Sequence, residues 1–177
     1  MQKTSCVLLA LLLFAGPAVA ADNGPFNPTS VDLWFSPSGG CTTACVAALD
    51  GAKESVYVQA YSFTSAPIAQ ALVNAKNRGV VVKVILDKSQ RSERYTEADF
   101  IAHAGIPTWI DAKHSIAHNK IMVIDEAIII TGSFNFTKSA ESSNAENMLV
   151  IHAKPMAARY ITNWQEHLAH SDIYVPK

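Results

Sequence analysis

Residues 118–135 constrain the fold more than any other stretch, because two apolar segments flank a very short turn. The segments cover residues 121–124 and 128–130, and Asp125-Glu126 lies between them. Apolar runs of this length around a two-residue turn predict a β-hairpin with buried strands. Polar residues stand at the open ends of both strands. The hairpin therefore places them at one edge of a sheet.

These polar residues form two pairs. His118 and Lys120 are two positions apart, so their side chains share one face of the first strand, and Ser133 and Asn135 repeat this spacing after the second strand. Because the strands run antiparallel, the pairs return to one neighbourhood. An imidazole, an ammonium, a hydroxyl and an amide suit a phosphate, since one group can attack or donate a proton while the others hold its oxygens.

The spacing resembles the HxK(x)4D(x)6GSxN signature of the phospholipase D superfamily, with Asp125 and Gly132 at the remaining typed positions. From about residue 31 onward, the order of elements is similar to that of the short, single-motif periplasmic endonucleases of the superfamily, the Nuc type. The resemblance implies an α/β fold with a mixed, mostly parallel sheet flanked by helices on both faces. It also implies phosphodiester hydrolysis through a covalent phosphohistidine, without a metal or cofactor.

The resemblance also implies a role for each motif residue. His118 is expected to attack phosphorus, Lys120 and Asn135 to hold the phosphoryl oxygens, and Ser133 to form hydrogen bonds within the site. Glu146 is the candidate for orienting His118, by accepting a proton from its second ring nitrogen. By contrast, Asp125 lies at the far end of the hairpin, at least a strand length from His118, and is expected to be structural.

The chain contains one copy of this motif, whereas the reaction needs a nucleophile and a separate acid. The resemblance therefore implies a homodimer, in which His118 of the partner subunit protonates the leaving oxygen. A two-fold interface allows this because it brings identical residues face to face. The expected substrate is nucleic acid, DNA or RNA.

The N-terminus has the pattern of a cleaved export signal. Lys3 precedes an apolar run over residues 6–14, and Ala18-Val19-Ala20 precedes the expected cleavage site. We expect a signal peptide over 1–21 and one nuclease domain over 22–177, periplasmic or secreted and without stable membrane association. Removing Lys3 from the 14 Lys+Arg leaves 13 against 15 Asp+Glu, so contact with a polyanion requires a local basic patch.

Two cysteines, Cys41 and Cys45, remain after the signal. In an oxidising compartment they can form a short-loop disulfide, which is slightly favoured. Two free thiols on the buried side of a helix are the alternative, because a bridge at this spacing is awkward unless the helix starts after Cys41.

Strand and helix patterns alternate along the rest of the chain. A strand over 55–63, a helix over 65–79 and a strand over 80–86 predict a parallel pair with a right-handed crossover. Residues 137–144 are expected to form a polar loop. Further strands are expected over 31–35, 107–110 and 146–151, and further helices over 41–52, 95–104 and 155–170.

Four residues outside the motif are candidates for substrate contact. The loop over 87–94 follows a strand at its C-terminal end, where α/β sheets usually bind ligands. The candidates are Lys88, Arg91, Arg94 and, in the approach to His118, His114. A solvated loop without substrate contact is an equally open interpretation for each of the three cations. The other histidines, His103, His152, His167 and His170, are expected at the surface or in structural roles.

Three other functions compete with a nuclease of this kind. A metal-dependent nuclease needs converging carboxylates, but Asp125 and Glu126 are adjacent on a turn and point apart. A lipid phosphodiesterase is the stronger alternative because lipid headgroups present the same phosphodiester, although no amphipathic helix with a basic face is evident. A non-catalytic phosphate-binding module would be expected to lose His118 or Lys120, and both are present.

Overall fold

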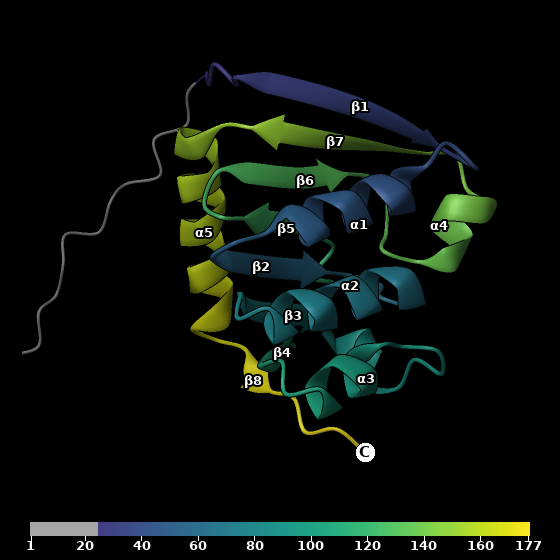
Figure 1. The fold of residues 1–177 in the computed structure, drawn as a ribbon. Coiled ribbons are helices and arrows are strands. Elements are labelled where there is room, and N and C mark those ends of the chain that lie inside the picture. The colour runs from purple at the N-terminus through teal and green to yellow at the C-terminus, as the bar shows by residue number, and fades with distance from the viewer. Residues whose placement is uncertain (1–24) are drawn as a thin grey trace, which may run out of the picture.

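The computed structural model describes residues 25–177, which form one eight-stranded sheet with helices on both faces (Figure 1). The predicted signal peptide over 1–21 lies outside the described residues. The strands are β1 Ser30–Ser36, β2 Ser55–Ala60, β3 Val81–Asp87, β4 Thr108–Asp111, β5 Lys120–Ile124, β6 Ile128–Gly132, β7 Glu146–His152 and β8 Asp172–Ile173. The helices are α1 Cys41–Gly51, α2 Ala66–Asn77, α3 Ala98–His103, α4 Lys138–Ser142 and α5 Lys154–Leu168, with a 3₁₀ turn η1 at Lys88–Arg91.

The sheet has the strand order β1-β7-β6-β5-β2-β3-β4-β8. The mixed α/β class is confirmed, and so is the parallel pairing of β2 with β3 across helix α2. The expectation of a mostly parallel sheet was wrong, because only β2, β3 and β4 run parallel and every other neighbouring pair is antiparallel. For the hairpin of β5 and β6 the physical reason is connection length. Parallel neighbours need a long crossover, whereas β5 and β6 are joined by a tight turn.

The two faces of the sheet bury separate apolar clusters. Along β2, Val56 and Val58 pack with α1 and α2 in the larger cluster, while Tyr57 points the other way. On that other face, Val123 of β5 and Ala157 of α5 belong to the smaller cluster. Alternation of side chains along each strand produces this division. Figure 1 shows α1, α2 and α3 in front of the sheet, with α5 crossing its strands.

Residues 138–142, expected within a polar loop, form the short helix α4. The hydroxyl of Thr137 accepts a hydrogen bond from the backbone N–H of Ala140 at 3.0 Å and caps this helix. The helix after this capping residue has only five residues, which are too few to show a helical periodicity in the sequence.

Cys41 and Cys45 are free, buried thiols in the structure, so the favoured prediction of a disulfide was wrong and the alternative of two free thiols is confirmed. Helix α1 begins at Cys41, which places the two side chains one turn apart on its buried face. Cys45 Sγ lies 3.3 Å from Met148 Sδ of β7. Burial raises the pKa of both thiols, so they stay protonated at neutral pH.

Candidate active site

The hairpin of β5 and β6 organises the candidate site. Met122 pairs with Ile130 and Ile124 with Ile128. The turn between them is closed by a hydrogen bond of 3.0 Å from Ala127 N–H to Ile124 O, and its two central residues have positive φ, 51° at Asp125 and 53° at Glu126. Positive φ at both turn residues matches the right-handed twist of paired strands. The hairpin therefore holds the start of β5 and the end of β6 at the same edge of the sheet, as expected.

Lys120 is the buried member of the site. Its Nζ donates a hydrogen bond of 2.6 Å to the backbone carbonyl of His118 and lies 5.0 Å from the ring centroid of Tyr61. Burial lowers the pKa of Lys120, and the negative charge of Glu146 acts in the opposite direction. The ring of Tyr61 also contacts the imidazole of His118, with centroids 4.6 Å apart. Tyr61 thus supports the nucleophile candidate and the cation together.

Backbone hydrogen bonds join three segments around this edge. Tyr61 N–H donates to Asn119 O at 2.9 Å, and the N–H groups of Thr64 and Ser65 each donate to Phe136 O at 3.0 Å. The chain after β2 therefore bridges the segment that carries His118 and the segment that carries Asn135. The side chain of His118 is exposed, so a substrate can reach it.

Ser133 and Asn135 follow β6 at the same edge. The hydroxyl of Ser133 accepts hydrogen bonds from the backbone N–H and the side-chain amide of Asn147, at 3.0 and 3.3 Å. Asn135 Oδ1 is buried and has no hydrogen-bond partner within residues 25–177. An amide can present either its oxygen or its two N–H donors, so Asn135 can serve an oxyanion. Asn147 was not anticipated from the sequence, because nothing distinguishes it from other polar strand residues.

Glu146 begins β7, and its negative charge favours the protonated form of Lys120. Its carboxylate accepts a hydrogen bond of 3.2 Å from Asn144 Nδ2. Within the described part of the chain, Glu146 and His118 are not hydrogen-bonded to each other. The orientation of His118 by Glu146 thus stays a prediction.

The candidate loop residues have partners within the chain. Lys88 Nζ donates to the backbone carbonyl of His114 at 3.1 Å, and Arg91 forms an exposed ion pair of 3.0 Å with Asp172. The guanidinium of Arg94 lies over the ring of Tyr95, at 5.3 Å. Each of the three cations therefore has a partner within the chain. Substrate contact by any of them stays a prediction.

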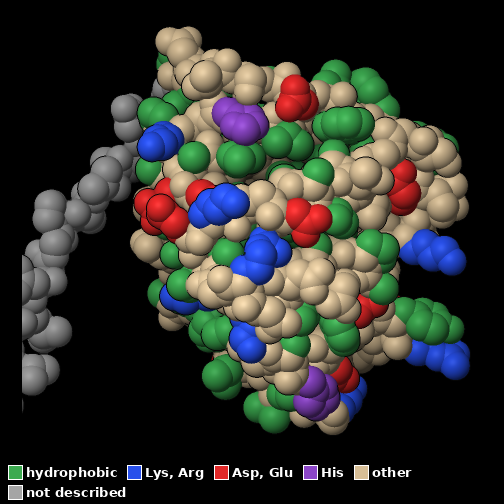
Figure 2. Space-filling model, viewed as in Figure 1, with side chains coloured by type: hydrophobic (Ala, Val, Ile, Leu, Met, Phe, Trp, Pro, Cys, Tyr) green, Lys and Arg blue, Asp and Glu red, His purple; other side chains and the backbone are tan. Residues whose placement is uncertain are grey.

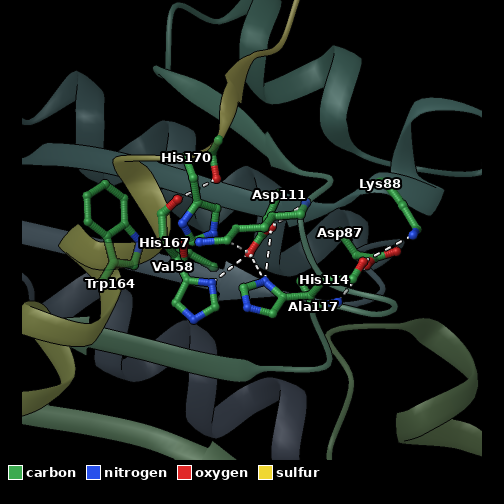
Figure 3. Close-up of polar contacts among 11 residues, drawn as sticks. Val58, Asp87, Lys88, Asp111, His114, Ala117, Trp164, His167 and His170 are labelled. Carbon is green, nitrogen blue, oxygen red and sulfur yellow. Dashed lines mark hydrogen bonds and ion pairs between the residues drawn. The ribbon is translucent and has the colours of Figure 1, made fainter.

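The side chain of His114 contacts Asp111. Its Nδ1 lies 3.0 Å from Asp111 Oδ2, and the same oxygen lies 2.6 Å from His167 Nδ1 (Figure 3). Burial opposes ionisation of Asp111, but hydrogen bonds from the surrounding histidines bring its pKa down to about 2. From the sequence, His167 was expected to have a surface or structural role, and Asp111 was not among the candidate residues. The spacing of three residues from Asp111 to His114, and from His167 to His170, was the available signal.

A second buried carboxylate holds the approach to His118. Asp87, at the end of β3, accepts a hydrogen bond of 2.8 Å from the backbone N–H of Ala117, the residue before His118 (Figure 3). Its other oxygen accepts from Ser89 N–H at 2.8 Å. Asp87 therefore positions the backbone that delivers the nucleophile candidate, a role the sequence alone does not reveal.

Comparison with known proteins agrees with this arrangement. The family model described as "Cardiolipin synthase, PLD-like domain" matches residues 45–168. A protein of Rickettsia typhi named Phospholipase D is 40% identical over 145 residues, which are 82% of this chain and 71% of that protein. A protein of Xenopus laevis named Mitochondrial cardiolipin hydrolase is 29% identical over 66% of this chain and 58% of its own.

Two solved structures share the fold. Nuc from Salmonella typhimurium, described as a phospholipase D family member, is 39% identical with a TM-score of 0.79, covering 82% of this chain and 97% of that one. NucT from Helicobacter pylori has the same fold at 22% identity, with a TM-score of 0.76 and coverage of 82% and 99%. The chain belongs to the phospholipase D superfamily. By class it is a phosphodiester hydrolase.

Proposed function

We propose that this hydrolase is a homodimeric endonuclease that cleaves DNA or RNA through a covalent phosphohistidine. One observation carries the proposal: the exposed imidazole of His118 stands beside the buried ammonium of Lys120 at an edge that also holds the amide of Asn135, whose buried oxygen has no hydrogen-bond partner among residues 25–177. A nucleophile, a cation and an amide donor are the groups needed to attack phosphorus and stabilise the charge on its oxygens.

In the first step, the lone pair of a His118 ring nitrogen attacks phosphorus. A P–N bond forms and the P–O bond to the leaving group breaks, while His118 of the partner subunit gives the leaving oxygen a proton. In the second step, that same histidine takes a proton from water, whose oxygen attacks phosphorus and releases His118. Lys120 and Asn135 from both copies hold the non-bridging oxygens throughout, where negative charge accumulates.

Two further residues support this chemistry. Ser133 ties the segment after β6 to Asn147 of β7, which keeps Asn135 in place. Glu146 balances the charge of Lys120 and, after substrate or partner binding, accepts a hydrogen bond from the second ring N–H of His118. Fixing the tautomer in this way leaves the attacking nitrogen unprotonated.

The location proposed for the enzyme is the periplasm or the extracellular medium. The support is the charged, apolar and small-residue pattern of residues 1–21, which leaves 22–177 as the mature nuclease domain. Among residues 25–177, none of the helices combines the length and apolar character needed to cross a bilayer. On the face formed by α1, α2 and α3, basic and acidic side chains are interspersed (Figure 2), so we place the polyanion contact at the edge of His118 instead.

Hydrolysis of a phospholipid is the second candidate. It is supported by the names of two relatives, Phospholipase D and Mitochondrial cardiolipin hydrolase, and by the phosphodiester shared between lipids and nucleic acids. The same catalytic groups would serve either substrate. Discrimination between them would depend on the surface around the site.

In the test, a protein of residues 22–177 is assayed in excess EDTA at low temperature against three kinds of substrate. These are DNA in single- and double-stranded form, RNA, and phosphatidylcholine vesicles. We expect cleavage of DNA or RNA to persist in EDTA, and His118→Ala to lose at least about 10³-fold in rate. His103→Ala, which removes an exposed imidazole on α3, is the matched control and should retain the wild-type rate. Cleavage of the vesicles alone would select the second candidate. Activity abolished by EDTA and restored by Mg²⁺ would contradict the phosphohistidine route.

A further inference from the structure

Three histidines converge on one buried carboxylate outside the proposed catalytic groups. Asp111 ends β4, His114 lies in the following loop, and His167 and His170 lie at the end of α5 and just after it. Asp111 Oδ2 is 2.6 Å from His167 Nδ1, 3.0 Å from His114 Nδ1 and 3.4 Å from His170 Nε2. Figure 3 shows the imidazole rings gathered around this carboxylate. We call Asp111, His114, His167 and His170 the histidine cluster.

Hydrogen bonds alone account poorly for the histidine cluster. A carboxylate oxygen offers two lone pairs, yet three ring nitrogens lie within 3.4 Å of Asp111 Oδ2, and of the three His114 Nδ1 alone is also paired with Oδ1, at 3.2 Å, among the described residues. The ring centroids are only 4.9 to 5.3 Å apart, so protonation of more than one ring would place like charges close together. A bound cation removes both problems, because it accepts a lone pair from each ring nitrogen and from the carboxylate.

The dimensions of the cluster are those of a small coordination site. One ligand atom from each residue lies within 4.8 Å of every other. Tetrahedral bonds of about 2.0 to 2.1 Å would separate the ligand atoms by roughly 3.3 Å. The three distances to Asp111 Oδ2, 2.6 to 3.4 Å, lie within about 0.7 Å of that value. Ligand atoms that lie up to 4.8 Å apart must approach one another, and the half-exposed His114 ring is free to rotate toward the others.

The donor set indicates which ion it would take. Three imidazole nitrogens and one carboxylate oxygen suit Zn²⁺, whereas Mg²⁺ and Ca²⁺ prefer oxygen donors alone. Asp111 Oδ1 accepts a hydrogen bond of 3.1 Å from Lys113 N–H, so this carboxylate already has the outer contact that orients metal ligands. Four protein ligands fill a tetrahedral site and leave no position for a reactive water. Such a site is structural.

We propose that the histidine cluster binds one Zn²⁺, which fastens the loop before His118 to the C-terminal end of α5. His114 is four residues before His118, and the same loop is held by Lys88 at the His114 carbonyl and by Asp87 at Ala117 N–H. The ion therefore stabilises the folded chain and limits the motion of the segment that delivers the nucleophile. It takes no part in bond breaking, so the inference goes beyond the proposed function and does not depend on it.

The test counts bound metal directly. Wild-type residues 22–177 are treated with a chelator, exchanged into chelator-free buffer, titrated with ZnCl₂ and analysed by mass spectrometry for zinc per chain. We expect about one Zn²⁺ per chain, and at least a 10-fold loss of affinity in the double variant His167→Gln, His170→Gln. His103→Gln is the matched control and should bind as wild type does. CoCl₂ in place of ZnCl₂ should give the visible absorption of a tetrahedral ion.

Thermal unfolding provides the second readout. Saturating ZnCl₂ should raise Tm by about 5 °C or more in wild type and His103→Gln, and leave it unchanged in the double variant. If the double variant does not fold, His114→Gln at the exposed side of the cluster must weaken binding. Equal zinc affinity in wild type and the variants, or no bound zinc in wild type, would overturn the proposal. His118→Ala should still bind zinc, which separates this result from the fate of the nuclease proposal.

Discussion

At the scale of single residues, Asp125 connects the motif to the rest of the sheet without approaching the substrate. Its carboxylate accepts hydrogen bonds from the backbone N–H groups of Lys53, Glu54 and Ser55, at 2.8 to 3.2 Å. Burial would raise its pKa, but these three donors outweigh burial and lower it. The turn of the hairpin is thereby tied to the start of β2. This placement agrees with a structural role for Asp125.

Asp125→Asn should therefore lower the stability of the fold and leave the catalytic rate unchanged. We expect the free energy of unfolding at pH 7 to fall by about 1 to 2 kcal/mol, because a neutral amide accepts these hydrogen bonds less strongly than a carboxylate. The folded-state pKa lies below the ordinary value of 3.8, so the stabilisation is complete above that pH and is lost as pH falls through the lowered pKa. Urea unfolding of wild type and the variant at pH 7 and pH 3 measures the difference in stability and its dependence on pH. A difference that does not shrink at pH 3 would contradict this assignment.

At the scale of elements, the hairpin depends on the absence of a side chain at Gly132. Its φ is 144°, and a Cβ there would lie 2.3 Å from Asn147 O and 3.0 Å from Met148 Cα. Both atoms belong to the backbone of β7, which cannot move without breaking its pairing with β6. Gly132 therefore lets β6 end against β7, in the geometry that presents Ser133 and Asn135.

Gly132→Ala should lower the free energy of unfolding by about 2 to 4 kcal/mol through steric overlap and backbone strain. Phosphodiesterase activity per folded molecule should fall as well, since Ser133 and Asn135 would shift with the strand. Gly51→Ala is the matched control, because a Cβ at Gly51 meets nothing within 4 Å. That substitution should be neutral or stabilising by about 0.5 to 1 kcal/mol. Equal chemical denaturation curves for the two variants would refute the steric argument.

At the scale of the whole molecule, one motif per chain raises the question of where the second histidine comes from. Among the histidines of the chain, His114 is the nearest to His118 in the sequence, and it contacts Asp111 in the histidine cluster. The exposed His118 is open to a second copy. A two-fold pair would bring both His118 side chains to one composite site.

Mixing experiments distinguish a composite site from independent sites. Wild-type and His118→Ala chains are unfolded together, refolded at equal input and assayed at constant total protein. Random pairing should leave about one quarter of the all-wild-type activity, because only wild-type pairs carry both histidines. Independent sites would leave about one half. A linear response to the wild-type fraction, or a fully active monomer by sedimentation, would refute the homodimer.

The sequence alone was sufficient for the features that depend on local order. Apolar runs on both sides of Asp125-Glu126 predicted the hairpin, and its antiparallel strands predicted that His118, Lys120, Ser133 and Asn135 lie at one edge of the sheet. The hairpin was confirmed because a tight turn between two apolar strands leaves little freedom in how the strands pair.

Only the tertiary structure decided the contacts between distant segments. Asp87 beneath Ala117, Asn147 beside Ser133, and the meeting of His167 with Asp111 join residues 14 to 56 positions apart. The antiparallel pairing of most neighbouring strands was also decided by the tertiary structure, because strand order depends on which apolar faces pack together. Local patterns carry no information on such pairings: each residue is compatible with many partners, and burial of the whole core selects one.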